Sequence, residues 1–196
     1  MARLEPLGDE ELRELTGVLT TLQGTIGFVP NSARTLGRWP TLAVGFQGLA
    51  AAMREAVDDL PTGLANLVHL VASQAAGCTY CQAHGAVTTV AHGVPEAKLA
   101  DVWSFETSTW FSEAERAALR LAAAAALSPS EATDAHFADL RRHYDDEQVV
   151  RIVGVIAISG FMNRWNATVA TTLEDTPKAA TEARLGGSGW QLGVHG

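Results

Sequence analysis

The sequence has few cysteines, few aromatic residues and no cluster of positive charge. Aromatic residues make up 7% of the 196 residues, and 14 lysines and arginines face 22 acidic residues, for a net charge of −8. No basic cluster exceeds the Arg141-Arg142 pair, which argues against binding to nucleic acid or to an anionic membrane surface. The longest apolar run, residues 149–162, contains Arg151 and is too short to span a bilayer. With no signal-peptide pattern at the N-terminus, these absences predict a cytoplasmic protein.

The composition predicts an all-α fold. Hydrophobic residues reach 47%, and alanine supplies much of that share, which favours helix over sheet. We expect about eight helices in one domain over residues 1–196. Helical periodicity runs on both sides of Gly77, over 62–76 and 79–91, and a long apolar helix is expected over 146–173. Proline and glycine recur from residue 174 onward, so residues 174–196 are expected to form an irregular tail.

The only two cysteines form a CxxC motif, Cys78-Thr79-Tyr80-Cys81, with His84 close behind. At this spacing on a helix or helix start, two sulfurs come close enough for a reversible disulfide, and the helix dipole and a histidine can lower a thiol pKa. Three other interpretations remain: inert buried thiols, a zinc site and a static disulfide. Zinc is disfavoured because no second pair of Cys or His ligands exists, and we expect no metal. On a regular helix His84 reaches Cys81 at i+3 but not Cys78.

Two polar groups interrupt otherwise apolar helices. Asn66, His69 and Ser73 form a stripe at i, i+3 and i+7, which indicates either a solvent-facing seam or a hydrogen-bond relay that faces the CxxC motif. The long helix carries Asn163-Arg164-Trp165-Asn166, which must find partners if buried. These four residues predict either the polar wall of a pocket or an ion pair or subunit contact.

The segment 77–84, GCTYCQAH, resembles the signature of the AhpD-like, carboxymuconolactone decarboxylase superfamily, and is most similar to its peroxidase-related branch. The resemblance extends in order and spacing over most of the chain. It includes residues 27–31 (GFVPN), 111–115 (FSEAE), 144–148 (YDDEQ), 163–166 (NRWN) and 189–195 (GWQLGVH).

The resemblance implies an all-α fold that assembles as dimers, trimers or hexamers, and a CxxC motif that reduces hydroperoxides through a disulfide cycle. It assigns the peroxide-attacking role to Cys81 and the resolving role to Cys78. Two positions depart from the peroxidase pattern. Its glutamate twelve residues before the first cysteine is Asn66 here, and its histidine four residues after the second cysteine is Gly85. An amide cannot carry a proton at neutral pH, so the relay falls to other groups.

The sequence thus predicts a thiol-dependent oxidoreductase of peroxidase type. Cys81 attacks the peroxide and becomes a sulfenic acid, Cys78 condenses with it, and an external dithiol resets the pair. His84 is the expected base, with Asn66, His69 and Tyr80 as relay residues, and no organic cofactor is expected. The rival hypothesis is a member of the superfamily without peroxidase activity, which binds or converts a small carbon compound. The degenerate relay favours the rival, and the intact CxxC motif favours the peroxidase.

Overall fold

The computed structural model describes residues 2–196, which form ten α-helices, four short 3₁₀ helices and no strand. The predicted all-α class is therefore confirmed, with more helices than the eight expected. None of the described helices is long and apolar enough to cross a membrane. The α-helices are α1 (Thr16–Ile26), α2 (Asn31–Leu36), α3 (Pro40–Asp59), α4 (Leu64–Ala75), α5 (Thr79–Ala91), α6 (Glu96–Ala100), α7 (Glu113–Ala125), α8 (Asp134–Leu140), α9 (Asp146–Val169) and α10 (Asp175–Leu185).

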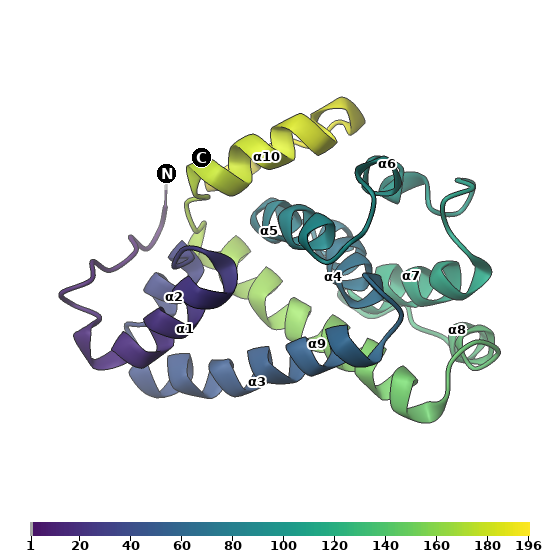
Figure 1. Ribbon diagram of the computed structural model, residues 1–196, viewed down its shortest axis with the longest axis horizontal. Coiled ribbons are helices and arrows are strands. Elements are labelled where there is room, and N and C mark those ends of the chain that lie inside the picture. The colour runs from purple at the N-terminus through teal and green to yellow at the C-terminus, as the bar shows by residue number, and fades with distance from the viewer. Residues whose placement is uncertain (1) are drawn as a thin grey trace.

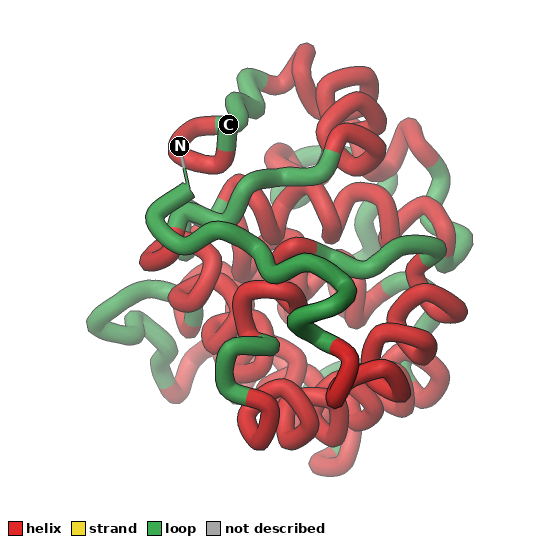
Figure 2. The backbone as a smooth tube through the Cα atoms, turned by 90° about the vertical axis from the view of Figure 1, so that its left-hand side faces the viewer, coloured by secondary structure: helices red, strands yellow, loops and turns green. Residues whose placement is uncertain are grey.

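The core is built around α4, whose sequence is apolar on nearly every face. Such a helix is stable only when it is covered on all sides, and α5, α7 and α9 pack against it. Helices α1 to α3 gather at one end of the molecule and α6 to α8 at the other, while α10 lies across α5 (Figure 1). In the perpendicular view, loops cross the face towards the viewer, and helices lie around and behind them (Figure 2). The two ends of the molecule are thus joined through α4, α5 and α9.

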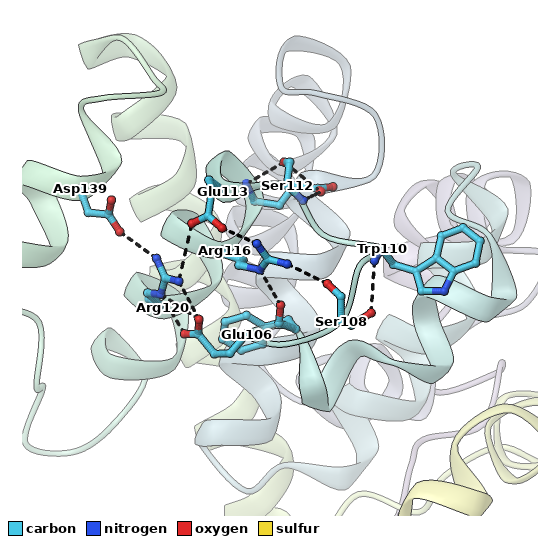
Figure 3. Close-up of polar contacts among 10 residues, drawn as sticks. Glu106, Ser108, Trp110, Ser112, Glu113, Arg116, Arg120 and Asp139 are labelled. Carbon is cyan, nitrogen blue, oxygen red and sulfur yellow. Dashed lines mark hydrogen bonds and ion pairs between the residues drawn. The ribbon is translucent and has the colours of Figure 1, made fainter.

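Two helices begin at capping residues. Ser112 caps α7 and Asp145 caps α9, each in a reciprocal capping box with the residue three positions on. The loop before α7 is fastened by two arginines of that helix (Figure 3). Arg116 donates to the carbonyl oxygens of Phe105 and Ser108, and Arg120 pairs with Glu106 at 2.7 Å.

Two expectations about the C-terminal part are wrong. The long helix ends at Val169 and not at residue 173, because Ala170 adopts a left-handed conformation with φ of 50°. Residues 174–196 are not an irregular tail, because Asp175–Leu185 forms α10. Pro177 lies in the first turn of α10, where a missing N–H costs nothing, and the glycines start only at Gly186. The glycines that favour an irregular tail lie beyond the end of α10, so they do not interrupt that helix.

Assembly of several copies stays a prediction. Exposed apolar side chains occur on α9, where Val150 and Val153 face outward, and at Trp39 before α3.

Candidate active site

The two cysteines lie at the junction of α4 and α5, as the sequence predicts. Gly77 has φ of 72°, a value that L-residues with side chains rarely adopt, and it turns the chain sharply after α4. Cys78 is the N-cap of α5 in an extended conformation, and its Sγ accepts a hydrogen bond from the Cys81 backbone N–H at 3.4 Å. Both cysteines are free thiols, 0% and 3% exposed respectively. The sulfurs therefore meet in a dry environment at a helix N-terminus.

Charge is divided unequally between the two thiols. A hydrogen bond with Cys81 lowers the pKa of Cys78 below its usual value; burial opposes this, and a hydrogen bond with His195 adds to it. Burial raises the pKa of Cys81 well above its usual value, and Cys78 raises it further. One proton is thus best held on Cys81, where it is donated to a Cys78 thiolate.

His84 belongs to a network anchored by Glu174. The carboxylate of Glu174 contacts His84 Nε2 at 2.8 Å and accepts from Tyr80 Oη at 2.9 Å. It also accepts from the backbone N–H of Asn31, and the backbone N–H of Ser32 donates to Tyr80 Oη. The Tyr80 and His84 rings stack with centroids 4.6 Å apart. His84 is thereby fixed in position by Glu174 and Tyr80, and it lines the same cavity as Cys81.

Glu174 is the most important site residue that the sequence analysis misses. It lies immediately before α10, in the segment expected to be irregular. Burial alone would raise the pKa of Glu174, but hydrogen bonds from His84 and from the Asn31 backbone hold it below the usual value. The sequence does indicate a helix start at this point, because the acidic pair Glu174-Asp175 comes just before a proline. Its distance of 90 positions from His84 along the chain gives no hint of contact.

The stripe Asn66, His69 and Ser73 faces the protein interior and not solvent. Ser73 Oγ donates to Asn163 Oδ1 at 3.0 Å, and His69 Nδ1 contacts Ser159 Oγ at 2.7 Å, so the stripe packs mainly against α9. Burial lowers the pKa of His69 to about 4, although a hydrogen bond with the Cys81 backbone opposes the shift. His69 is therefore neutral at pH 7 and fixes the position of Cys81. The Asn66 amide is buried, and its Nδ2 has no partner among residues 2–196.

The predicted motif of residues 163–166 divides between site and surface. Asn166 Nδ2 donates to Cys81 Sγ at 3.4 Å, and Asn166 Oδ1 accepts from Thr171 Oγ1 at 2.8 Å. Asn163 is buried against Ser73, and Trp165 Nε1 donates to Thr35 Oγ1 at 3.0 Å. Arg164 is exposed. Only Asn166 touches a sulfur, where its N–H stabilises negative charge on Cys81.

A largely apolar cavity of about 220 Å³ opens onto Cys81. Side chains of α1, α2 and α3 form most of its wall, including Leu22, Ile26, Leu36, Phe46 and Met53. The polar end is formed by Cys81, His84, Tyr80, His69 and Asn166. Cys78 does not line the cavity, so a bound molecule meets Cys81 first.

The chain was next compared with known proteins. A debrominase of known crystal structure, Bmp8, is 36% identical, with alignment over 91% of this chain and 96% of the debrominase and a TM-score of 0.84. A second structure, a cysteine-to-alanine variant of that debrominase in complex with 2,3,4-tribromopyrrole, gives a TM-score of 0.85 at the same identity. The family model "Carboxymuconolactone decarboxylase family" matches residues 40–124. This chain belongs to the AhpD-like, carboxymuconolactone decarboxylase superfamily.

More distant relatives share the fold alone. An uncharacterized peroxidase-related protein from Ralstonia eutropha JMP134 is 24% identical over 87% of this chain and 88% of its own, with a TM-score of 0.72. No curated protein sequence matches the chain. The resemblance noted in the sequence is thus confirmed at the level of the superfamily, and the peroxidase reaction is not.

Within this superfamily, the two departures from the peroxidase pattern have structural counterparts in the chain. A side chain at Gly85 would meet the His69 ring, since an added Cβ would lie 3.1 Å from His69 Cδ2. His69 thus occupies the space beside Gly85. Position 66 holds an amide, and the carboxylate of Glu174 pairs with His84 at 2.8 Å. A histidine–carboxylate pair is therefore present, built from different positions.

Proposed function

We propose that the protein is a dithiol oxidoreductase that removes halogen reductively from a small halogenated aromatic ring. The observation that carries the proposal is the apolar cavity that exposes Cys81 but not Cys78. A cavity of about 220 Å³ suits a compact apolar molecule and offers few polar partners. A 36% identical protein is a debrominase, and a variant of it binds 2,3,4-tribromopyrrole, which is a molecule of this kind.

The reaction balances with the groups present. Cys81 passes its proton to the Cys78 sulfur and attacks bromine as a thiolate, so a sulfur–bromine bond forms and the carbon–bromine bond breaks, leaving its electron pair on carbon. A proton from His84, held by Glu174 at 2.8 Å, converts that carbon to C–H. Cys78 then releases that proton and attacks Cys81 sulfur as a thiolate, bromide leaves, and a disulfide forms. Two thiols and one C–Br bond give one disulfide, one C–H bond, bromide and a proton, and an external dithiol restores the thiols.

A hydroperoxide is the second candidate substrate. The two thiols can deliver two electrons and two protons to an O–O bond, with the His84–Glu174 pair passing one of the protons, which yields an alcohol, water and a disulfide. The apolar wall of the cavity would favour an alkyl hydroperoxide over hydrogen peroxide. The two candidates differ in the product that they release, which permits a direct test.

The experiment is a single turnover of the reduced protein without added reductant. Tetrabromopyrrole, an unhalogenated pyrrole and cumene hydroperoxide are each mixed with the protein, and bromide and free thiols are measured. We expect one bromide for every two thiols lost, no reaction with the unhalogenated ring, and loss of turnover in Cys81→Ser. The exposed substitution His143→Gln is the matched control. Thiol loss with cumene hydroperoxide alone would establish the second candidate, and no thiol loss with any compound would refute both.

A further inference from the structure

Helix α3 carries one amide on the face that it turns to the cavity. Phe46, Ala50 and Met53 line the cavity from this face, at the spacing of successive helical turns, and all three are apolar. Gln47 lines the cavity among them. The Phe46 ring stacks on the Phe161 ring of α9 with centroids 5.2 Å apart, which holds this part of α3 in place. An amide is therefore set into an apolar wall at a fixed position.

The side-chain oxygen of Gln47 has no hydrogen-bond partner among residues 2–196. This Oε1 atom is buried, and none of the described groups donates to it. The other buried side-chain atoms without a partner in the described part of the chain belong to residues that do not line the cavity. A buried acceptor without a donor lowers stability, because its desolvation is not compensated, and such groups are uncommon in folded proteins. A donor on a bound molecule would compensate it.

The other polar side chains that α1 and α3 contribute to the cavity wall are occupied or exposed. Thr21 Oγ1 donates to the Gly17 carbonyl oxygen at 2.9 Å, and Thr25 Oγ1 donates to the Thr21 carbonyl oxygen at 2.8 Å. Arg54 lines the cavity from α3 but is exposed, so solvent can satisfy its guanidinium. Solvent does not reach the Gln47 oxygen. On this side of the cavity, Gln47 is therefore the group whose hydrogen bonding a ligand would complete.

We propose that Gln47 is a specificity-determining residue whose Oε1 accepts a hydrogen bond from an N–H group of the halogenated ring. This inference rests on the proposed function, and it narrows the substrate class to halogenated rings with an N–H group of their own, such as pyrroles. On such a ring the N–H is the hydrogen-bond donor. The Gln47 amide turns about its last side-chain torsion with little restriction, so its oxygen can follow the bound ring.

The acceptor and the reactive sulfur lie on different helices that line one cavity. Gln47 belongs to α3 and Cys81 to α5, so a ring between them is held through its N–H while its halogen meets the sulfur. An apolar pocket alone discriminates weakly between rings of similar size. A site that hydrogen-bonds an N–H group rejects an analogue without it far more strongly, because the acceptor is then left unpaired.

The test is a calorimetric titration of Cys81→Ala, in which the cavity has no thiol, with two rings. One is 2,3,4-tribromopyrrole, and the other is 2,3,4-tribromothiophene, which keeps the bromines but has no N–H. We expect the pyrrole to bind at least about fivefold more tightly, the low end of the effect of an unpaired buried acceptor. Gln47→Met in the same background keeps the side-chain length without the amide and should remove most of this preference. Gln74→Met, an exposed change, is the matched control and should leave it unchanged.

Equal affinities for the two rings, a preference that persists in Gln47→Met, or no binding of either ring would overturn the inference. A second measurement covers the case in which Gln47→Met does not fold. The ¹³C signal of the Gln47 side-chain carbonyl in labelled Cys81→Ala should shift with the pyrrole and not with the thiophene, and equal shifts would refute the role. Neither measurement uses turnover. Absence of bromide release with the preference intact would therefore refute the dehalogenation and not this inference.

Discussion

Replacing Glu174 by glutamine tests whether the C-terminal segment holds the site together. The Glu174 side chain is 15% exposed and accepts from Tyr80 Oη and the Asn31 backbone N–H while it pairs with His84. In Glu174→Gln, the amide oxygen can still accept from the first two partners, but the charge is lost. Hydrogen bonds to charged groups contribute about 1.5–3 kcal/mol, and neutral ones about 1 kcal/mol. Loss of charge across this cluster should therefore lower the free energy of unfolding by about 1.5–3 kcal/mol at pH 7.

The pH dependence sharpens this prediction. The folded-state pKa of Glu174 lies below 4.5, its usual value, so its contribution to stability is complete above pH 4.5 and is lost as pH falls through the folded-state pKa. The free energy of unfolding in urea should therefore be lower for Glu174→Gln than for the native chain. This difference should be constant near neutral pH and should shrink in acid. Glu182→Gln, an exposed change on the same helix, should show no such difference. A difference in free energy of unfolding between the native chain and Glu174→Gln of under about 0.5 kcal/mol at pH 7, or a difference that persists in acid, would contradict the reasoning.

Two further substitutions test the packing of the site, and one labelling experiment tests the reactivity of its thiols. Gly85→His places a side chain against the His69 ring, because an added Cβ would lie 3.1 Å from His69 Cδ2, and it should lower stability by about 1–3 kcal/mol in thermal unfolding. Adding His69→Ala should recover part of this loss, and no recovery would show that the His69 ring is not the cause. Ser73→Ala removes the 3.0 Å hydrogen bond to buried Asn163 and should cost about 1–3 kcal/mol in urea unfolding, against no measurable change for exposed Ser130→Ala. Iodoacetamide should modify Cys81 before the other cysteine, because only Cys81 lines the cavity; peptide mapping that shows the reverse order would refute this.

The sequence predicts the parts of the site that are local. Gly77 marks the junction of two helices, and the CxxC motif and His84 follow within one turn or two, so periodicity and spacing alone place them correctly. The contacts of Glu174 and His195 are set by how α10 and the following segment fold back on α5, and no local pattern encodes that return. The stripe at Asn66 shows the same limit, because periodicity detects a polar face without indicating whether solvent or α9 covers it.

Glu174 contacts His84 from 90 positions further along the chain. During synthesis at about 5–20 residues per second, the two cysteines are therefore made roughly 5–20 s before the carboxylate that supports the site. The nascent chain carries both thiols without the Glu174 carboxylate or the buried imidazole of His195. The contacts of the candidate site are therefore complete only when the last segment of the chain has emerged and folded back on α5.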